Sequence, residues 1–108
     1  MKKIEYHKLV RDRIPEIIEE DGNTCICTEL SEQDYITMLD QKLNEELAEY
    51  QESKSMEELA DLLEVMSAVA AARGSSLDEV EQIRQKKKQK RGGFEKRILL
   101  KTVFEQES

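Results

Sequence analysis

Two adjacent stretches of helical periodicity limit most strongly the folds that are open to this chain. They cover residues 31–52 and 55–73, and the short break between them is Ser53-Lys54-Ser55, of which Ser55 also caps the later stretch. A connection this short joins neighbouring helices in the manner of an antiparallel hairpin. Ser55 and Glu58 have the Ser-x-x-Glu spacing of a capping box, which predicts that the later helix begins there. The sequence therefore predicts a helical hairpin as the centre of the fold.

A shorter helix is predicted on each side of the hairpin. The first opens near residues 12–13, since Pro15 is tolerated only in a first helical turn, and it stops at Gly22. The last opens at Ser76 and fades near residues 92–93, which are both glycine. The chain is thus expected to contain four helices.

The composition agrees with an all-α bundle that forms a single domain over residues 1–108. There is one proline and no tryptophan, and 38% of the residues are charged. Such a profile favours helices over a sheet. We expect at most a short β-ribbon, made by residues 24–29 and 97–104.

The net charge and the distribution of apolar residues limit the classes of partner and the cellular compartment that we expect. The net charge of −7 argues against general nucleic-acid binding. No stretch approaches the roughly 18 apolar residues of a membrane span, and the first residues have no signal-peptide pattern. Cys25 and Cys27 have no companions that would complete a zinc site, and they are expected to be small buried residues in a reducing compartment. We therefore expect a cytoplasmic protein with no membrane or nucleic-acid partner.

Acidic residues interrupt the apolar face of the first hairpin helix. At about 100° per residue, Glu46 falls inside the apolar arc, Glu49 lies at its edge, and Glu45 lies further towards solvent. The arc consists of Tyr35, Ile36, Leu39, Leu43, Leu47 and Tyr50.

The second hairpin helix repeats this arrangement. Glu58 falls inside its apolar arc, and Asp61 lies near the edge. This arc consists of Leu59, Leu62, Leu63, Val65, Met66, Val69 and Ala70. Each helix therefore places one acid in its apolar face and another beside it.

An antiparallel hairpin brings these two acid pairs together. Residues three apart on a helix have Cβ atoms about 5–6 Å apart, so two facing pairs form a cage of hard oxygen ligands. Such a cage suits Mg²⁺ or Mn²⁺, and without a cation the partly buried like charges would repel. The alternative is a non-catalytic helical interaction module, in which the acids are solvated and Glu58 merely closes the capping box with Ser55.

The acidic segments resemble a known signature. Glu45-Glu46-Leu47-Ala48-Glu49, followed by Glu58-Leu59-Ala60-Asp61, is similar to the Glu-Glu-x-x-Glu and Glu-x-x-Asp motifs of MazG-type all-α nucleoside triphosphate pyrophosphohydrolases. The core of the resemblance covers residues 31–75. It implies a MazG-like four-helix bundle with four Mg²⁺ ligands, and Glu45 as an outer partner. The implied ligands are Glu46, Glu49, Glu58 and Asp61.

The flanks are similar to a phosphoribosyl-ATP pyrophosphohydrolase-like branch of that superfamily. The similar segments are residues 8–15 and 90–94. The chain departs from most members in the short spacing between Glu49 and Glu58, which shortens the hairpin. The resemblance implies cleavage of a nucleoside triphosphate between the α and β phosphates, to give a nucleoside monophosphate and pyrophosphate. The alternative substrate is phosphoribosyl-ATP, in histidine biosynthesis.

This reaction requires a base and positive charge for the phosphates. Glu46 or Glu49 is the candidate general base. The basic helix end is the main candidate for substrate binding, although it also suits a solvated end that complements the helix dipole. The substrate-binding candidates are Lys87, Lys90, Arg91, Lys8 and Arg11. Because apolar residues such as Met38 lie opposite the main arc, we also expect a homodimer or homotetramer.

Overall fold

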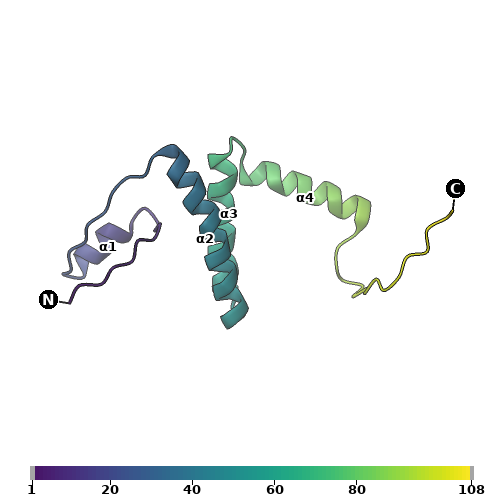
Figure 1. The fold of residues 1–108 in the computed structure, drawn as a ribbon, viewed down its shortest axis with the longest axis horizontal. Helices are drawn as coiled ribbons and strands as arrows, with labels where there is room; N and C mark the ends of the chain where they lie inside the picture. The colour runs from purple at the N-terminus through teal and green to yellow at the C-terminus, as the bar shows by residue number, and fades with distance from the viewer. Residues whose placement is uncertain (1, 108) are drawn as a thin grey trace. The chain divides into compact units, whose positions relative to one another are not determined.

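The computed structural model describes residues 2–107, and within this range the chain is all-α (Figure 1). The structure thus confirms that the chain is all-α and that the four predicted helices form within this range. These are α1 (Ile14–Glu20), α2 (Glu32–Ser53), α3 (Met56–Ala72) and α4 (Leu77–Arg91).

The short β-ribbon that the sequence allowed does not form within residues 2–107. Residues 24–29 and 97–104 are neither helix nor strand. Their large apolar side chains, such as Ile26 and Leu99, are exposed. Neither segment therefore has the half-buried surface against which strands are stable.

Local capping explains where the two long helices begin. The Ser31 hydroxyl accepts a hydrogen bond from the Asp34 backbone N–H at 3.2 Å, and Ser55 accepts one from the Glu58 N–H at 3.3 Å. Each bond fills one of the backbone donors that a helix start leaves unpaired. Gly74 follows α3 with φ of +82°, a conformation that glycine adopts without strain. The predicted boundaries are correct to within one or two residues at these positions.

The chain divides into two compact units. One contains the residues up to Leu77, and the other contains the residues from Asp78 onwards. In the first unit α2 and α3 lie side by side (Figure 1). Leu39 of α2 and Val65 and Ala70 of α3 are buried in that unit. The prediction of a single domain stays a prediction.

Much of the predicted apolar surface is exposed in this chain. Leu47 on α2 is 45% exposed, and Leu63 and Met66 on α3 are 49% and 39% exposed. These side chains are therefore not buried within one chain. Contact with a single neighbouring helix covers only part of each arc.

Two further expectations concern the burial of the cysteines and the absence of a membrane span. Cys25 and Cys27 are free thiols with their Sγ atoms 3.9 Å apart. Cys25 is half-buried, but Cys27 is exposed, so the expectation that both are buried is wrong for Cys27. Among residues 2–107, no helix combines the length and the apolar character needed to span a membrane.

Candidate metal centre

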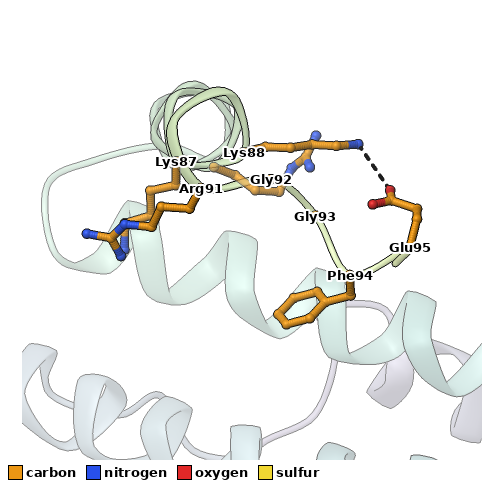
Figure 2. A pocket seen from close by; sticks show the side chains of 8 residues that line it. Lys87, Lys88, Arg91, Gly92, Gly93, Phe94 and Glu95 are labelled. Carbon is orange, nitrogen blue, oxygen red and sulfur yellow. Dashed lines mark ion pairs between the residues drawn. The ribbon is translucent and has the colours of Figure 1, made fainter. Parts of the chain in front are cut away.

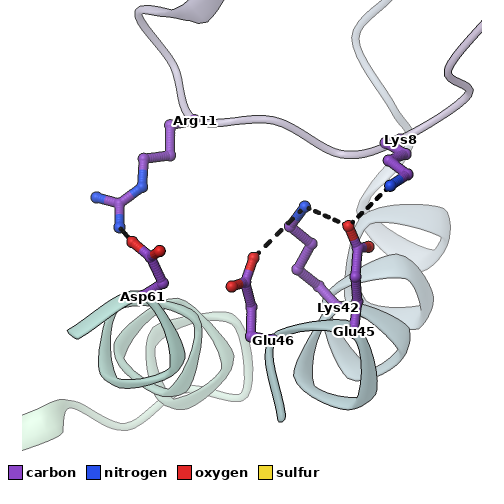
Figure 3. A network of polar contacts seen from close by, with 6 residues as sticks. All are labelled: Lys8, Arg11, Lys42, Glu45, Glu46 and Asp61. Atoms are coloured by element: carbon purple, nitrogen blue, oxygen red, sulfur yellow. Dashed lines mark hydrogen bonds and ion pairs between the residues drawn. The ribbon is translucent and has the colours of Figure 1, made fainter. Parts of the chain in front are cut away.

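Three carboxylates from α2 and α3 converge in the first unit. Glu46, Glu58 and Asp61 each offer one oxygen, and these oxygens all lie within 4.8 Å of one another. Glu46 is only 8% exposed, whereas the other two are half-buried. Figure 3 shows the Glu46 and Asp61 side chains rising towards the same segment of the chain. The side-by-side packing of the two helices thus brings one acid of α2 beside two acids of α3.

Two oxygens of this cluster have no partner. Oε2 of Glu46 and Oε2 of Glu58 are buried and accept no hydrogen bond from the residues that the structure describes. Buried polar atoms are normally paired, because losing hydration without compensation is costly. The Ser55 N–H donates to the Ser53 hydroxyl at 3.3 Å, so it does not bond to the Glu58 carboxylate. The donor set and these unpartnered oxygens fit a hard divalent cation.

The electrostatics of the cluster show the cost of gathering these acids. Burial raises the pKa of Glu46, and the neighbouring Glu49 carboxyl raises it further. The pKa of Glu58 is also raised, first by desolvation and then by the charges of Glu49 and Asp61. Desolvation and like charges both disfavour the ionised form. A cation at this position would oppose both effects.

Glu49 occupies a different place from the other predicted ligands. It is exposed, and its oxygens are not among those that converge. Its carboxyl nevertheless lies near enough to raise the pKa values of Glu46 and Glu58. Its roles as a ligand and as a general base stay predictions, while Glu46, Glu58 and Asp61 carry the geometry of the site.

The segment before α1 brings two predicted substrate-binding residues to the acids (Figure 3). Nη2 of Arg11 lies 2.7 Å from Oδ1 of Asp61. Nζ of Lys8 lies 3.2 Å from Oε1 of Glu45. These partners are far apart in the sequence, so the pairing depends on the tertiary fold. Positive charge therefore borders the acidic cluster on the side of the N-terminal segment.

Lys42 is a further member of this network that the sequence reasoning missed. Its Nζ lies 3.4 Å from Oε1 of Glu45 and 3.7 Å from Oε1 of Glu46. Its spacing of three and four residues from these acids is the sequence signal that would have identified it. Partial burial, the largest single influence, raises the pKa of Glu45, but Lys8 and Lys42 together outweigh it and lower that pKa. Glu45 is thus engaged by cations beside the cluster.

The basic residues of α4 form a separate feature within the second unit. Lys87 and Arg91 line an open groove of about 750 Å³, together with Arg84 and Phe94. Lys90, also predicted to bind substrate, is not among the residues that line it. Arg84 and Phe94 were not predicted. The spacing of Arg84, Lys87 and Arg91, which puts them on one helix face, is the signal that indicates Arg84.

Comparison with known proteins gives one short likeness. No protein-family model matches the chain, and no solved structure matches it. Over 42 residues it is 52% identical to a Mycolicibacterium smegmatis protein whose description is "uncharacterized protein". The match covers 39% of this chain and 43% of that relative, so it spans less than half of either. The resemblance to MazG-type enzymes stays a prediction.

Proposed function

We propose that the protein is a Mg²⁺-dependent pyrophosphohydrolase that cleaves a nucleoside triphosphate between its α and β phosphates. The observation that carries the proposal is the convergence of Glu46, Glu58 and Asp61, in which two buried oxygens have no hydrogen-bond partner among residues 2–107. In this proposal α2 and α3 form the antiparallel hairpin of a MazG-like bundle. The Glu-Glu-x-x-Glu and Glu-x-x-Asp spacing supports this choice of reaction.

The three converging acids would hold the cation. When bound, Mg²⁺ would neutralise charge at the attacked phosphorus and favour ionisation of the attacking water. Glu49 lies beside these acids without joining the converging oxygens, so its carboxylate would be placed to accept a proton from that water. Glu49 is therefore our candidate general base.

The N-terminal segment would bind the phosphates. Arg11 and Lys8 already lie against carboxylates of the site, at 2.7 Å and 3.2 Å. Both ion pairs are largely exposed and therefore weak, so phosphate oxygens can replace the carboxylates. Guanidinium groups suit this role because their fork of N–H donors matches phosphate geometry.

Product analysis tests the proposal. The chain is incubated with nucleoside triphosphates, deoxynucleoside triphosphates and phosphoribosyl-ATP, in Mg²⁺ or in EDTA. We expect pyrophosphate and a nucleoside monophosphate in Mg²⁺ alone, and a strong loss of activity in Asp61→Asn. Glu64→Gln changes an exposed acid on the same helix and is expected to retain activity.

Four outcomes would refute or change the proposal. Absence of pyrophosphate from every substrate, or full activity in Asp61→Asn, would refute it. Release of orthophosphate instead would assign cleavage to a different bond. A strong preference for phosphoribosyl-ATP would select the histidine-biosynthesis alternative.

A further inference from the structure

A basic groove lies entirely within the second unit, where α4 ends and the chain turns away (Figure 2). Its volume of about 750 Å³ is within the range of small-molecule sites. The lining residues are Arg84, Lys87, Lys88, Arg91, Gly92, Gly93, Phe94 and Glu95. The groove is distinct from the acidic cluster, none of whose residues line it.

Some of the cationic side chains that line the groove pair with acidic residues, and others do not. Lys88 lies 3.7 Å from Glu95, and Arg84 pairs with Glu81. The side chains of Lys87 and Arg91 make no hydrogen bond or ion pair with any residue in the range 2–107. Figure 2 shows their side chains extending in the same direction from α4. Two adjacent cations without counter-charges favour an anionic ligand.

An aromatic ring adjoins these cations. Phe94 is 97% exposed, although burial would be favourable for a side chain of this kind. Gly92 has φ of +84° and donates its N–H to the Lys88 carbonyl at 2.7 Å, which fixes the turn that carries Phe94. The Gly92 N–H is therefore not available to an anion. An exposed ring beside cations is the combination with which proteins stack a nucleobase and bind its phosphates.

We propose that this groove binds a nucleoside triphosphate without a metal, with Lys87 and Arg91 on the phosphates and Phe94 stacked on the base. The choice of a nucleotide over another polyphosphate rests on the proposed function. A single exposed ring matches one base, and the net charge of −7 disfavours a long polyanion. The groove thus supplies a nucleotide site in the second unit.

Calorimetric titration of the full chain in EDTA tests this site, with ATP and inorganic triphosphate as ligands. Arg91→Gln is expected to lower the affinity for both ligands by about tenfold, because it removes a charge-assisted contact to phosphate. Phe94→Leu is expected to lower the affinity for ATP by about fivefold or more. The affinity for triphosphate should not change, because only ATP has a base to stack. Both positions are exposed, so neither change should impair folding.

Lys86→Gln is the matched control. It removes the same charge from the same helix, at an exposed position that does not line the groove. Equal weakening by Lys86→Gln and Arg91→Gln would indicate only a diffuse positive field and would overturn the proposal. So would equal loss of ATP and triphosphate in Phe94→Leu, absence of ATP binding, or tighter binding of oligo-dT than of ATP.

The two proposals fail in different ways. If ATP binds in EDTA but no pyrophosphate is released in Mg²⁺, the proposed reaction is wrong and the proposed nucleotide site in the groove is supported. If pyrophosphate is released but ATP does not bind in EDTA, the proposed nucleotide site is wrong and the proposed reaction is supported.

Discussion

At the scale of single residues, Glu46 and Glu58 are the groups whose ionisation opposes folding most directly. Both have raised pKa values, caused first by burial and then by neighbouring carboxylates. The folded chain therefore binds protons more tightly than the unfolded chain at these positions. Their contribution to stability is complete below the ordinary carboxyl pKa of 4.5 and is lost as the pH rises through the raised values.

A pH series in EDTA tests this consequence. The free energy of unfolding, measured with urea, is expected to fall from pH 4.5 upwards in part because Glu46 ionises. Glu46→Gln cannot ionise, so its stability should decline less over the same range. If the free energy of unfolding depended on pH identically in the two proteins, the pKa of Glu46 would not be raised in the folded chain. Saturating Mg²⁺ should recover stability at pH 7 in the wild-type protein, since a ligand that binds only the folded state stabilises it.

Arg11 provides a second prediction for a single side chain. It lies 2.7 Å from Asp61, so in the absence of nucleotide it competes with a metal for that carboxylate. We expect Arg11→Gln to bind Mn²⁺ about two- to fivefold more tightly, which is the range for an exposed ion pair. Arg13→Gln is the control, since Arg13 pairs with Glu16 and not with the cluster. Equal affinity in the two variants would contradict direct competition at Asp61.

At the scale of helices, capping at Ser55 has two consequences, whereas capping at Ser31 has one. Each serine hydroxyl accepts a backbone N–H, and its replacement by alanine should cost about 1 kcal/mol of stability. Ser55 caps the N–H of Glu58, a proposed ligand, so Ser55→Ala should also weaken Mn²⁺ binding. Ser31→Ala should leave the affinity for Mn²⁺ unchanged. Equal Mn²⁺ affinity in the two variants would show that the Ser55 cap does not contribute to metal binding.

The helices also show what local sequence can specify. Their ends are local features, set by serine caps and by glycine at Gly74 and Gly92, and were predicted closely. The rotation of each helix about its own axis is set by packing. The wheel placed Glu46 inside the apolar arc and Glu49 at its edge, and the structure buries Glu46 and exposes Glu49. The Arg11–Asp61 pair joins residues 50 positions apart, and no local pattern predicts it.

At the scale of the whole molecule, the exposed apolar surface of α3 predicts self-association. Leu59, Leu63 and Met66 are 39%, 49% and 39% exposed. Apolar area of this kind gains about 25 cal/mol per Å² on burial, which favours a second copy of the chain. We expect a dimer or tetramer by light scattering at micromolar concentration, and a lower mass for Leu63→Glu. A monomeric mass for the wild-type protein would contradict this expectation.

Charge is distributed unevenly along the chain. Residues 1–77 include 18 acidic and eight basic residues, whereas residues 78–108 include six acidic and nine basic residues. The acidic unit repels an anionic substrate unless a cation offsets its charge. The proposed reaction therefore depends on the metal site.

A Mn²⁺ titration followed by electron paramagnetic resonance tests the metal site, because the signal reports free Mn²⁺ whether or not a substrate is present. We expect saturable Mn²⁺ binding to the wild-type chain and to Glu64→Gln. We expect at least about tenfold weaker binding to Glu58→Gln, which loses one ligand charge. Equal Mn²⁺ affinity in Glu58→Gln and Glu64→Gln would contradict the proposed metal centre.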